Sequence, residues 1–322
     1  MEDVEISQEL LQTEENIQKY LHRACRVEEE YWRQKSRSMW LQAGDKNTSY
    51  FHKQVEARNH FKTVNEIQFQ GNLVKDFEGI KKAAHSYFKD LFSAPEEDPI
   101  DANCYPLDLV PKLVQETDNL LLAAPIRMEE LKKALDGMDA DKAPGPDGFT
   151  ARFFTSCWPI IKIDLLRMVT KSQSNSKLGG STNSDFLALI PKEKGANNFS
   201  RFRPISLCNT GYKLITKIIS NRIKNMLSAI IPENQGGFIK GWKIMDNIVL
   251  VQEAIHSSCQ RKEKGMVIKL DLANAFDRVR HDFLFAVMGK FGFSKDFINW
   301  VKAYIASLWI APLVNGRSMN FF

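Results

Sequence analysis

The sequence predicts an α+β fold, and three segments predict it. Residues 214–231 repeat apolar side chains at helical spacing, so one face of a long helix is apolar. The short apolar run 186–191 suits a buried strand. Residues 266–272 read Met-Val-Ile-Lys-Leu-Asp-Leu and predict a second core strand, whose faces alternate along the chain. With 322 residues, 43% of them hydrophobic, the chain can bury one large core and carry an appendage.

Residues 1–62 are strongly charged and predict a helical extension. Aromatic side chains stand among its bases, a pattern that suits either stacking on nucleotides or, more often, packing within a helix pair. Residues 63–125 predict a variable connecting region, with a turn at 70–72 and a helix at 78–92. The acidic, proline-containing stretch 94–106 is the best candidate for a linker.

The third region, 126–322, begins with a short amphipathic helix at 128–138, and Gly137 near its end favours termination there. The segment KAPGPDGF that follows predicts an exposed loop, because two prolines and two glycines suit neither a helix nor a central strand. Residues 244–258 predict another helix. Residues 313–322 predict a hairpin that turns at Asn-Gly.

Basic residues are concentrated in one segment. The whole chain carries a net charge of +5, whereas residues 191–250 contain ten Lys or Arg and three Asp or Glu, a net charge of +7. Such a local excess suits a surface for a polyanion, since each neutralised phosphate releases counterions. An ordinary solvated face explains the charge equally well.

Composition excludes several classes of protein. The N-terminus is acidic and has no apolar stretch of signal-peptide type, and the longest uncharged apolar run, 120–126, is too short to cross a bilayer. Five cysteines without paired spacing support neither a zinc knuckle nor a disulfide framework. We therefore expect an intracellular protein with no membrane partner, and the nucleus is a candidate compartment.

The strand predicted at 266–272 carries the residue on which the functional interpretation depends. Asp271 lies near its end and points away from the face of Ile268 and Leu270. A carboxylate held there could bind a divalent ion, as two-metal phosphoryl-transfer enzymes require. The alternative is a strand-end or capping acid, with Asp277 beginning the next helix. Spacing alone favours this alternative.

Six segments in fixed order reverse that preference. They are WLQAGDKNTSYFH (40–52), KAPGPDGF (142–149), LALIPKEKGA (187–196), FRPISLCNTGYKLITKIISNRIK (202–224), NQGGFIKGWKIMDNIVLVQE (234–253) and KLDLANAFDRV (269–279). Together they resemble the reverse transcriptases of non-LTR (LINE-type) retrotransposons, especially those abundant in plant genomes. The resemblance implies an RNA-directed DNA polymerase, which uses an RNA template, a DNA primer, deoxynucleoside triphosphates and two magnesium ions.

The resemblance also implies a partial polymerase right hand, with fingers and an incomplete palm in residues 126–322. Asp271 matches the first metal-binding aspartate of the palm, and the carbonyl of Leu272 is a backbone ligand beside it. Phe276 matches the aromatic residue that lies under the incoming sugar and excludes a 2′-hydroxyl, although by itself it would pass for a core aromatic. Arg203 matches the fingers arginine that engages the triphosphate, and Lys192 could assist it.

Later motifs of that family, Gln-Gly-Asp-Pro and Ala-Asp-Asp, do not occur in this sequence. We therefore expect a chain truncated before the remaining palm motifs and the thumb, and without polymerase activity of its own, because one aspartate cannot hold two metals. The alternative function is that of a non-catalytic nucleic-acid-binding remnant. The polymerase interpretation requires Asp271 to close a buried strand beside Arg203 and Phe276, and it falls if these side chains lie far apart or if the acid lies on open surface.

Overall fold

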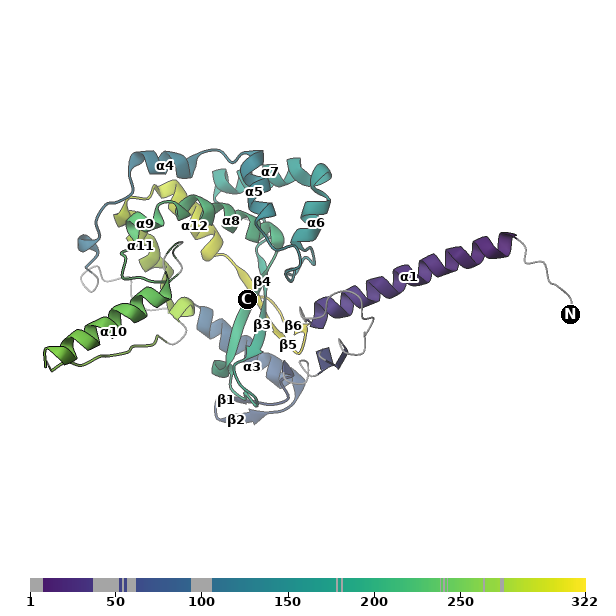
Figure 1. Cartoon of the computed structure of the whole chain (residues 1–322), viewed down its shortest axis with the longest axis horizontal. Helices are drawn as coiled ribbons and strands as arrows, with labels where there is room; N and C mark the ends of the chain where they lie inside the picture. Colours follow the sequence, from purple (N-terminus) through teal and green to yellow (C-terminus); the bar gives the residue numbers. More distant parts are fainter. Residues whose placement is uncertain are drawn as a thin grey trace. The chain divides into compact units, whose positions relative to one another are not determined.

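The structure is a computed structural model of the chain, drawn in Figure 1. It describes residues 8–36, 52–53, 55–56, 62–93, 106–177, 179–180, 182–237, 239, 241, 243–262, 264–272 and 275–322. The chain divides into two compact units, the first made of residues 1–77 and 190–203 and the second of residues 78–189 and 204–322. The predicted linker, apart from Pro106, and residues 40–51 of the first motif lie outside the described residues.

The first unit contains the long helix α1 (Gln8–Ser36) and a small hairpin, β1 (Ile67–Phe69) and β2 (Asn72–Val74). The hairpin turns through Gln70 and Gly71, both at positive φ, as a two-residue turn of right-handed strands requires. The turn predicted at 70–72 is thus confirmed. The fully buried Ile67 anchors the hairpin, and the amide of Gln68 donates a hydrogen bond of 2.6 Å to the carbonyl of Asn197.

The second unit contains most of a four-stranded sheet in the order β4-β3-β5-β6. Its strands are β3 (Ser184–Pro191), β4 (Phe202–Cys208), β5 (Trp309–Val314) and β6 (Arg317–Ser318). The strands β3 and β5 pair in parallel with Ser184 opposite Trp309, although they lie far apart in the sequence. The strands β5 and β6 form the hairpin predicted from Asn-Gly, with positive φ at Asn315 and Gly316.

Helices make up the rest of the second unit. They are α3 (Phe77–Phe92), α4 (Glu116–Ala123), α5 (Met128–Asp136), α6 (Ala151–Ser156), α7 (Trp158–Asn175), α8 (Thr210–Lys224), α9 (Leu227–Ile230), α10 (Ile244–Gln260), α11 (His281–Phe291) and α12 (Lys295–Ile305), with 3-10 turns at Leu107–Leu109 and Ala275–Arg278. None of the helices in the described ranges is both long enough and apolar enough to cross a membrane.

The main core lies where α4, α5, α7, α8, α11 and α12 meet, and Figure 1 shows α4, α5, α7, α8 and α12 gathered together. Leu214, Ile215 and Ile218 of α8 are fully buried there, as their apolar stripe predicts. Trp300 and Tyr304 of α12 bury the largest side chains of the core, and both contact the hydroxyl of Ser172. The stripe thus correctly identifies the central helix.

The sequence-predicted boundaries of that helix are wrong. Instead of running from 214 to 231, α8 begins at Thr210 and ends at Lys224, and the separate short helix α9 follows. The start is earlier because the backbone of Asn209 is extended and precedes the first turn. The side chain of Asn209 is engaged elsewhere, as its Oδ1 accepts the amide of Asp147 in the proline-glycine loop.

The loop 142–149 packs closely against the start of α8. An added Cβ at Gly145 would overlap the backbone nitrogen of Asn209, so only glycine fits there. The hydroxyl of Thr210 donates to the carbonyl of Phe149 at 2.6 Å. The prediction of an irregular loop is confirmed, and its glycine serves a close backbone approach.

One arginine joins three of the helices. The guanidinium of Arg222 on α8 donates two hydrogen bonds of 2.7 Å to the carboxylate of Glu130 on α5. It also donates to the carbonyls of Leu122 and Ala124 at the end of α4, at 2.7 and 2.8 Å. Its side chain is only 9% exposed, and its carbon Cζ lies 6.0 Å from the ring centre of Trp300. Arg222 is therefore a structural tie, although the sequence counts it among the bases of the +7 segment.

Candidate functional site

The segment 266–272 does not form the predicted strand. Its backbone is not part of a strand, and its side chains are exposed, including Met266 at 82%, Leu270 at 83% and Leu272 at 77%. Asp271 is likewise exposed. The prediction that Asp271 closes a buried strand is therefore wrong for the described structure. A core strand needs a hydrogen-bonded neighbour and a covered face, and the described sheet β4-β3-β5-β6 offers 266–272 neither.

Phe276 lies a few residues further on, in the 3-10 turn Ala275–Arg278, and is 81% exposed. This exposure argues against the alternative that Phe276 is a core aromatic. The predicted helix start at Asp277 is also wrong, because α11 begins at His281. The neighbours Asp277 and Arg278 lie close to Tyr87 of α3. Burial raises the pKa of Tyr87, Arg278 opposes that shift and Asp277 adds to it.

Arg203 and Lys192 belong to the first unit, at the ends of β4 and β3. Arg203 is exposed, next to the buried Phe202. The amide of Lys192 donates to the carbonyl of Arg201 at 2.9 Å, which continues the strand pairing, and its ammonium donates to the carbonyl of Ser200 at 2.8 Å. Lys192 therefore has a backbone partner, whereas Arg203 is an exposed residue whose guanidinium suits bidentate contact with a phosphate.

The structure thus groups the predicted site residues by unit. Arg203 and Lys192 belong to the first unit, and Asp271, Leu272 and Phe276 belong to the second. Asp271 and Leu272 end the described segment 264–272, and Phe276 lies in the 3-10 turn Ala275–Arg278.

A two-magnesium site does not fit the described residues. Such a site needs several carboxylates around two ions a few ångströms apart. Within the described ranges, no three His, Cys, Asp or Glu side chains come close enough to hold a metal. Asp271, exposed on an unpaired segment, offers a single carboxylate and one adjacent carbonyl.

The buried acid Asp185 was not among the site residues predicted from the sequence. It lies on β3, fully buried, and neither of its carboxylate oxygens has a hydrogen-bond partner among the described residues. Burial raises its pKa, although the nearby Ser206 hydroxyl, the Leu207 amide and the Cys208 thiol oppose the shift. Burial also raises the pKa of Cys208 to about 12, and the charge of Asp185 adds to this. Alternation along β3 could have revealed Asp185, because it shares a face with the buried Leu187.

Comparison with known proteins identifies the relatives of this chain. Residues 190–322 match the protein family described as reverse transcriptase (RNA-dependent DNA polymerase). Over 298 residues, 89% of the chain, the sequence is 30% identical to the transposon TX1 uncharacterized 149 kDa protein of Xenopus laevis, of which this covers 22%.

Two further relatives are more distant. The chain is 26% identical, over 56% of its length, to the probable RNA-directed DNA polymerase from transposon BS of Drosophila melanogaster, and covers 20% of that protein. It is 25% identical, also over 56% of its length, to the retrovirus-related Pol polyprotein from type-1 retrotransposable element R2 of Popillia japonica, and covers 24% of it. The chain therefore spans about a fifth to a quarter of these relatives. It contains a fragment of a reverse transcriptase domain of the non-LTR retrotransposon kind.

Proposed function

We propose that this reverse transcriptase fragment supplies the fingers and part of the palm of an RNA-directed DNA polymerase, encoded by a plant-type non-LTR element. The family match over residues 190–322 is the observation that carries the proposal. Its substrates would be an RNA template, a DNA primer and deoxynucleoside triphosphates. We keep the sequence-predicted division into a helical extension (1–62), a connecting region (63–125) and a polymerase portion (126–322) as part of the proposal, together with a nuclear location.

Within this proposal, Arg203 binds the triphosphate of the incoming nucleotide and Lys192 assists it. The exposed guanidinium of Arg203 supports that role, since its fork can donate two hydrogen bonds to phosphate oxygens. Phe276 restricts the sugar, and Asp271 with the Leu272 carbonyl forms the first part of a magnesium site. Asp271 lies on open surface, so the buried-strand requirement is not met, and the family match over residues 190–322 alone carries this assignment.

The chain by itself should not polymerise. Its described residues do not fit a two-metal site, and the sequence has no Ala-Asp-Asp segment to complete one. The missing carboxylates would have to come from residues outside this sequence. The segment 266–272 would then gain the strand neighbour that it lacks here.

Primer extension on an RNA template, with magnesium or manganese, tests whether the chain is inactive by itself. We expect no incorporation by the chain as printed. Incorporation that disappears in Asp271→Asn would show that the chain is complete enough for catalysis and would refute its inactivity. The genomic DNA beyond the codon for Phe322 tests whether the remaining carboxylates are encoded downstream. A reading frame encoding Ala-Asp-Asp there supports the polymerase origin, and unrelated coding sequence opposes it.

A non-catalytic nucleic-acid-binding role is the second candidate, and the exposed bases of the +7 segment favour it. Seven bases of the segment are exposed among the described residues, and two of these, Lys192 and Arg201, have partners in the structure. The other five are Lys194, Arg203, Lys217, Lys224 and Lys243.

Fluorescence anisotropy with an RNA–DNA duplex over a salt series measures this binding. Each phosphate contact adds about 0.9 to the slope of log affinity against log salt. We expect Lys217→Ala to lower both affinity and slope, and Lys295→Ala, an exposed lysine outside the segment, to change neither. Equal effects of the two variants would contradict a role for the segment.

A further inference from the structure

The long helix α1 carries an apolar stripe whose side chains are exposed in the part of the chain that the structure describes. Leu10, Ile17, Tyr20, Val27 and Tyr31 are 52–74% exposed, although α1 is 29 residues long. Large apolar side chains scattered singly on a surface are ordinary, but a continuous stripe along one helix marks an interaction surface.

The stripe repeats every seven residues. If Leu10 is assigned position a of a heptad, each a and d position from 10 to 31 is apolar except Thr13. The a positions are Leu10, Ile17, Ala24 and Tyr31, and the d positions are Thr13, Tyr20 and Val27. A repeat of this kind sustained over three to four heptads, flanked by charged residues, is typical of a coiled coil. The one extra apolar side chain on an adjoining position, Leu21 at e, widens the stripe.

Polar interactions on the opposite side of α1 indicate that this side faces solvent. Lys19 and Glu15 form an ion pair of 2.7 Å there, at positions c and f. Gln18 donates to the carboxylate of Glu14 across the edge of the stripe. These two polar pairs lie at outer positions of the helix, where Leu11 at position b is also exposed, and the seam is left for a partner.

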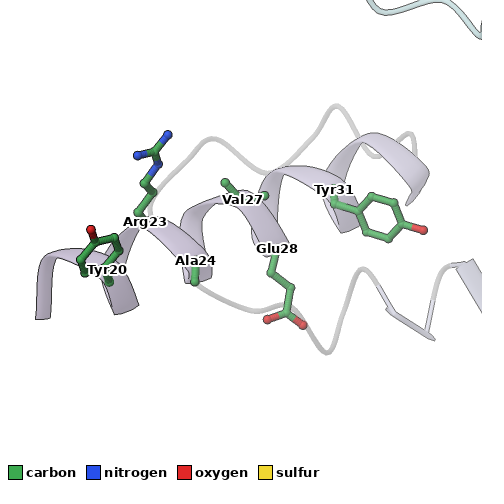
Figure 2. A pocket seen from close by; sticks show the side chains of 6 residues that line it. All are labelled: Tyr20, Arg23, Ala24, Val27, Glu28 and Tyr31. Atoms are coloured by element: carbon green, nitrogen blue, oxygen red, sulfur yellow. The ribbon is translucent and has the colours of Figure 1, made fainter. Parts of the chain in front are cut away.

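Figure 2 shows how the seam is shaped in its middle. The small side chain of Ala24 lies between the rings of Tyr20 and Tyr31 and leaves a shallow hollow of about 620 Å³. Arg23 and Glu28 project from opposite sides of the helix and flank this hollow, at positions g and e. A hollow bordered by a, d, e and g residues is the kind of hole that receives a side chain from a facing helix.

We propose that α1 pairs with the α1 of a second copy of this chain as a parallel, in-register coiled coil. Charge decides both the occupant and the direction. In a parallel pair each g residue faces the e residue five positions later in the other helix. Arg23 then faces Glu28, and Glu30 faces Lys35, and each of these attractive pairs occurs twice by symmetry. The pair of Glu9 and Glu14 is repulsive and also occurs twice, so attractive contacts outnumber repulsive ones.

The antiparallel arrangement is less favourable. In that arrangement g faces g and e faces e. If two antiparallel copies of α1 overlap along the whole seam, Arg23 faces Arg23 and Glu14 faces Glu28, and both contacts join like charges. Nor can Arg23 and Glu28 pair within one helix, because residues five apart do not lie side by side. Their complementarity is therefore used only between two parallel copies. This inference is independent of the proposed polymerase role.

Sedimentation equilibrium of the full chain tests the proposal. We expect a monomer–dimer equilibrium that Ile17→Glu/Val27→Glu shifts to monomer. The matched control is Gln12→Glu/His22→Glu, which adds the same charge at outer positions of α1 and should leave the dimer intact. Because the substituted seam residues are exposed in the single chain, circular dichroism of the monomeric variant should remain close to that of the control.

Charge reversal tests the partner and the direction. Arg23→Glu or Glu28→Arg alone should weaken dimerisation about five- to tenfold, and the double variant should restore it. Ala24→Cys in a Cys25→Ser/Cys259→Ser background, which removes both exposed free thiols of the described residues, should form a symmetric disulfide-linked dimer, which the Cys25→Ser/Cys259→Ser chain should not form. A monomeric wild-type chain, or a dimer indifferent to both seam glutamates, would overturn the proposal. A dimer that Arg23→Glu leaves unchanged would overturn the parallel direction, because an antiparallel pair would only exchange one like-charge contact at position 23 for another.

Discussion

Replacing Arg222 by methionine should destabilise the second unit by about 3 kcal/mol. The substitution keeps an unbranched apolar side chain in place but removes four hydrogen bonds, two to Glu130 and one each to the carbonyls of Leu122 and Ala124. Removing one partner of a buried ion pair costs about 3–5 kcal/mol. The lower end applies here, because the side chain of Glu130 is 30% exposed and water can replace part of the lost contact.

Urea unfolding followed by tryptophan fluorescence measures this loss. Trp300 lies beside the guanidinium and reports on the same core. We expect a lower midpoint with an unchanged slope, which indicates a change in stability rather than in the surface exposed on unfolding. Arg222→Lys should lose roughly half as much, since an ammonium keeps the charge but cannot reproduce the fork.

Two comparisons make the result decisive. Arg167→Met removes a surface ion pair with Asp164, whose side chains are 73% and 77% exposed, and should cost less than about 0.5 kcal/mol. In the double variant Glu130→Gln/Arg222→Met, the two losses should not add, because the partners share one interaction. A loss below about 1 kcal/mol in Arg222→Met, or full additivity, would show that Arg222 does not tie the helices together.

Three further outcomes are expected. Because burial raises the pKa of Asp185, the folded chain keeps its proton where the unfolded chain has lost it, so stability should fall as the pH rises above the ordinary carboxyl value of 3.8. Asp185→Asn should flatten this dependence in thermal melts at pH 4 and pH 7, and an unchanged pH profile would contradict it. Gly145→Ala should cost about 2 kcal/mol in urea unfolding, since its Cβ meets the backbone of Asn209, whereas Gly180→Ala, with open space around it, should be nearly neutral. Asp271→Asn should leave the melting temperature unchanged because the side chain is exposed, and a large drop would indicate that it packs in the fold.

Local signals predicted the elements that depend on local chemistry. The hairpin at the Asn-Gly turn, the helix α5 with its end at Gly137 and the turn at Gln70-Gly71 are all found where the sequence places them. Each depends on backbone angles or on a helical stripe that neighbouring residues alone determine. The sequence-predicted α+β class follows from these elements and is found in the structure.

Elements that depend on distant partners were predicted less well. Residues 266–272 have the composition of a core strand, but no described strand pairs with them, and composition cannot supply that partner. The role of Arg222 was equally hidden, since its acceptor Glu130 lies on another helix. The functional roles of Asp271, Phe276, Arg203 and Lys192 come from motif resemblance and stay predictions.

The pairing of β3 with β5 has a consequence for how this protein folds. The two strands are separated by roughly 120 residues, so their ladder can form only after a long loop has closed. During synthesis, β3 leaves the ribosome well before β5 has been made. Until then, the backbone groups on the edge of β3 that pairs with β5 have no strand partner. Acquisition of the native sheet should therefore be a late and slow event, and chaperones that shield open strand edges should raise the yield of folded chain.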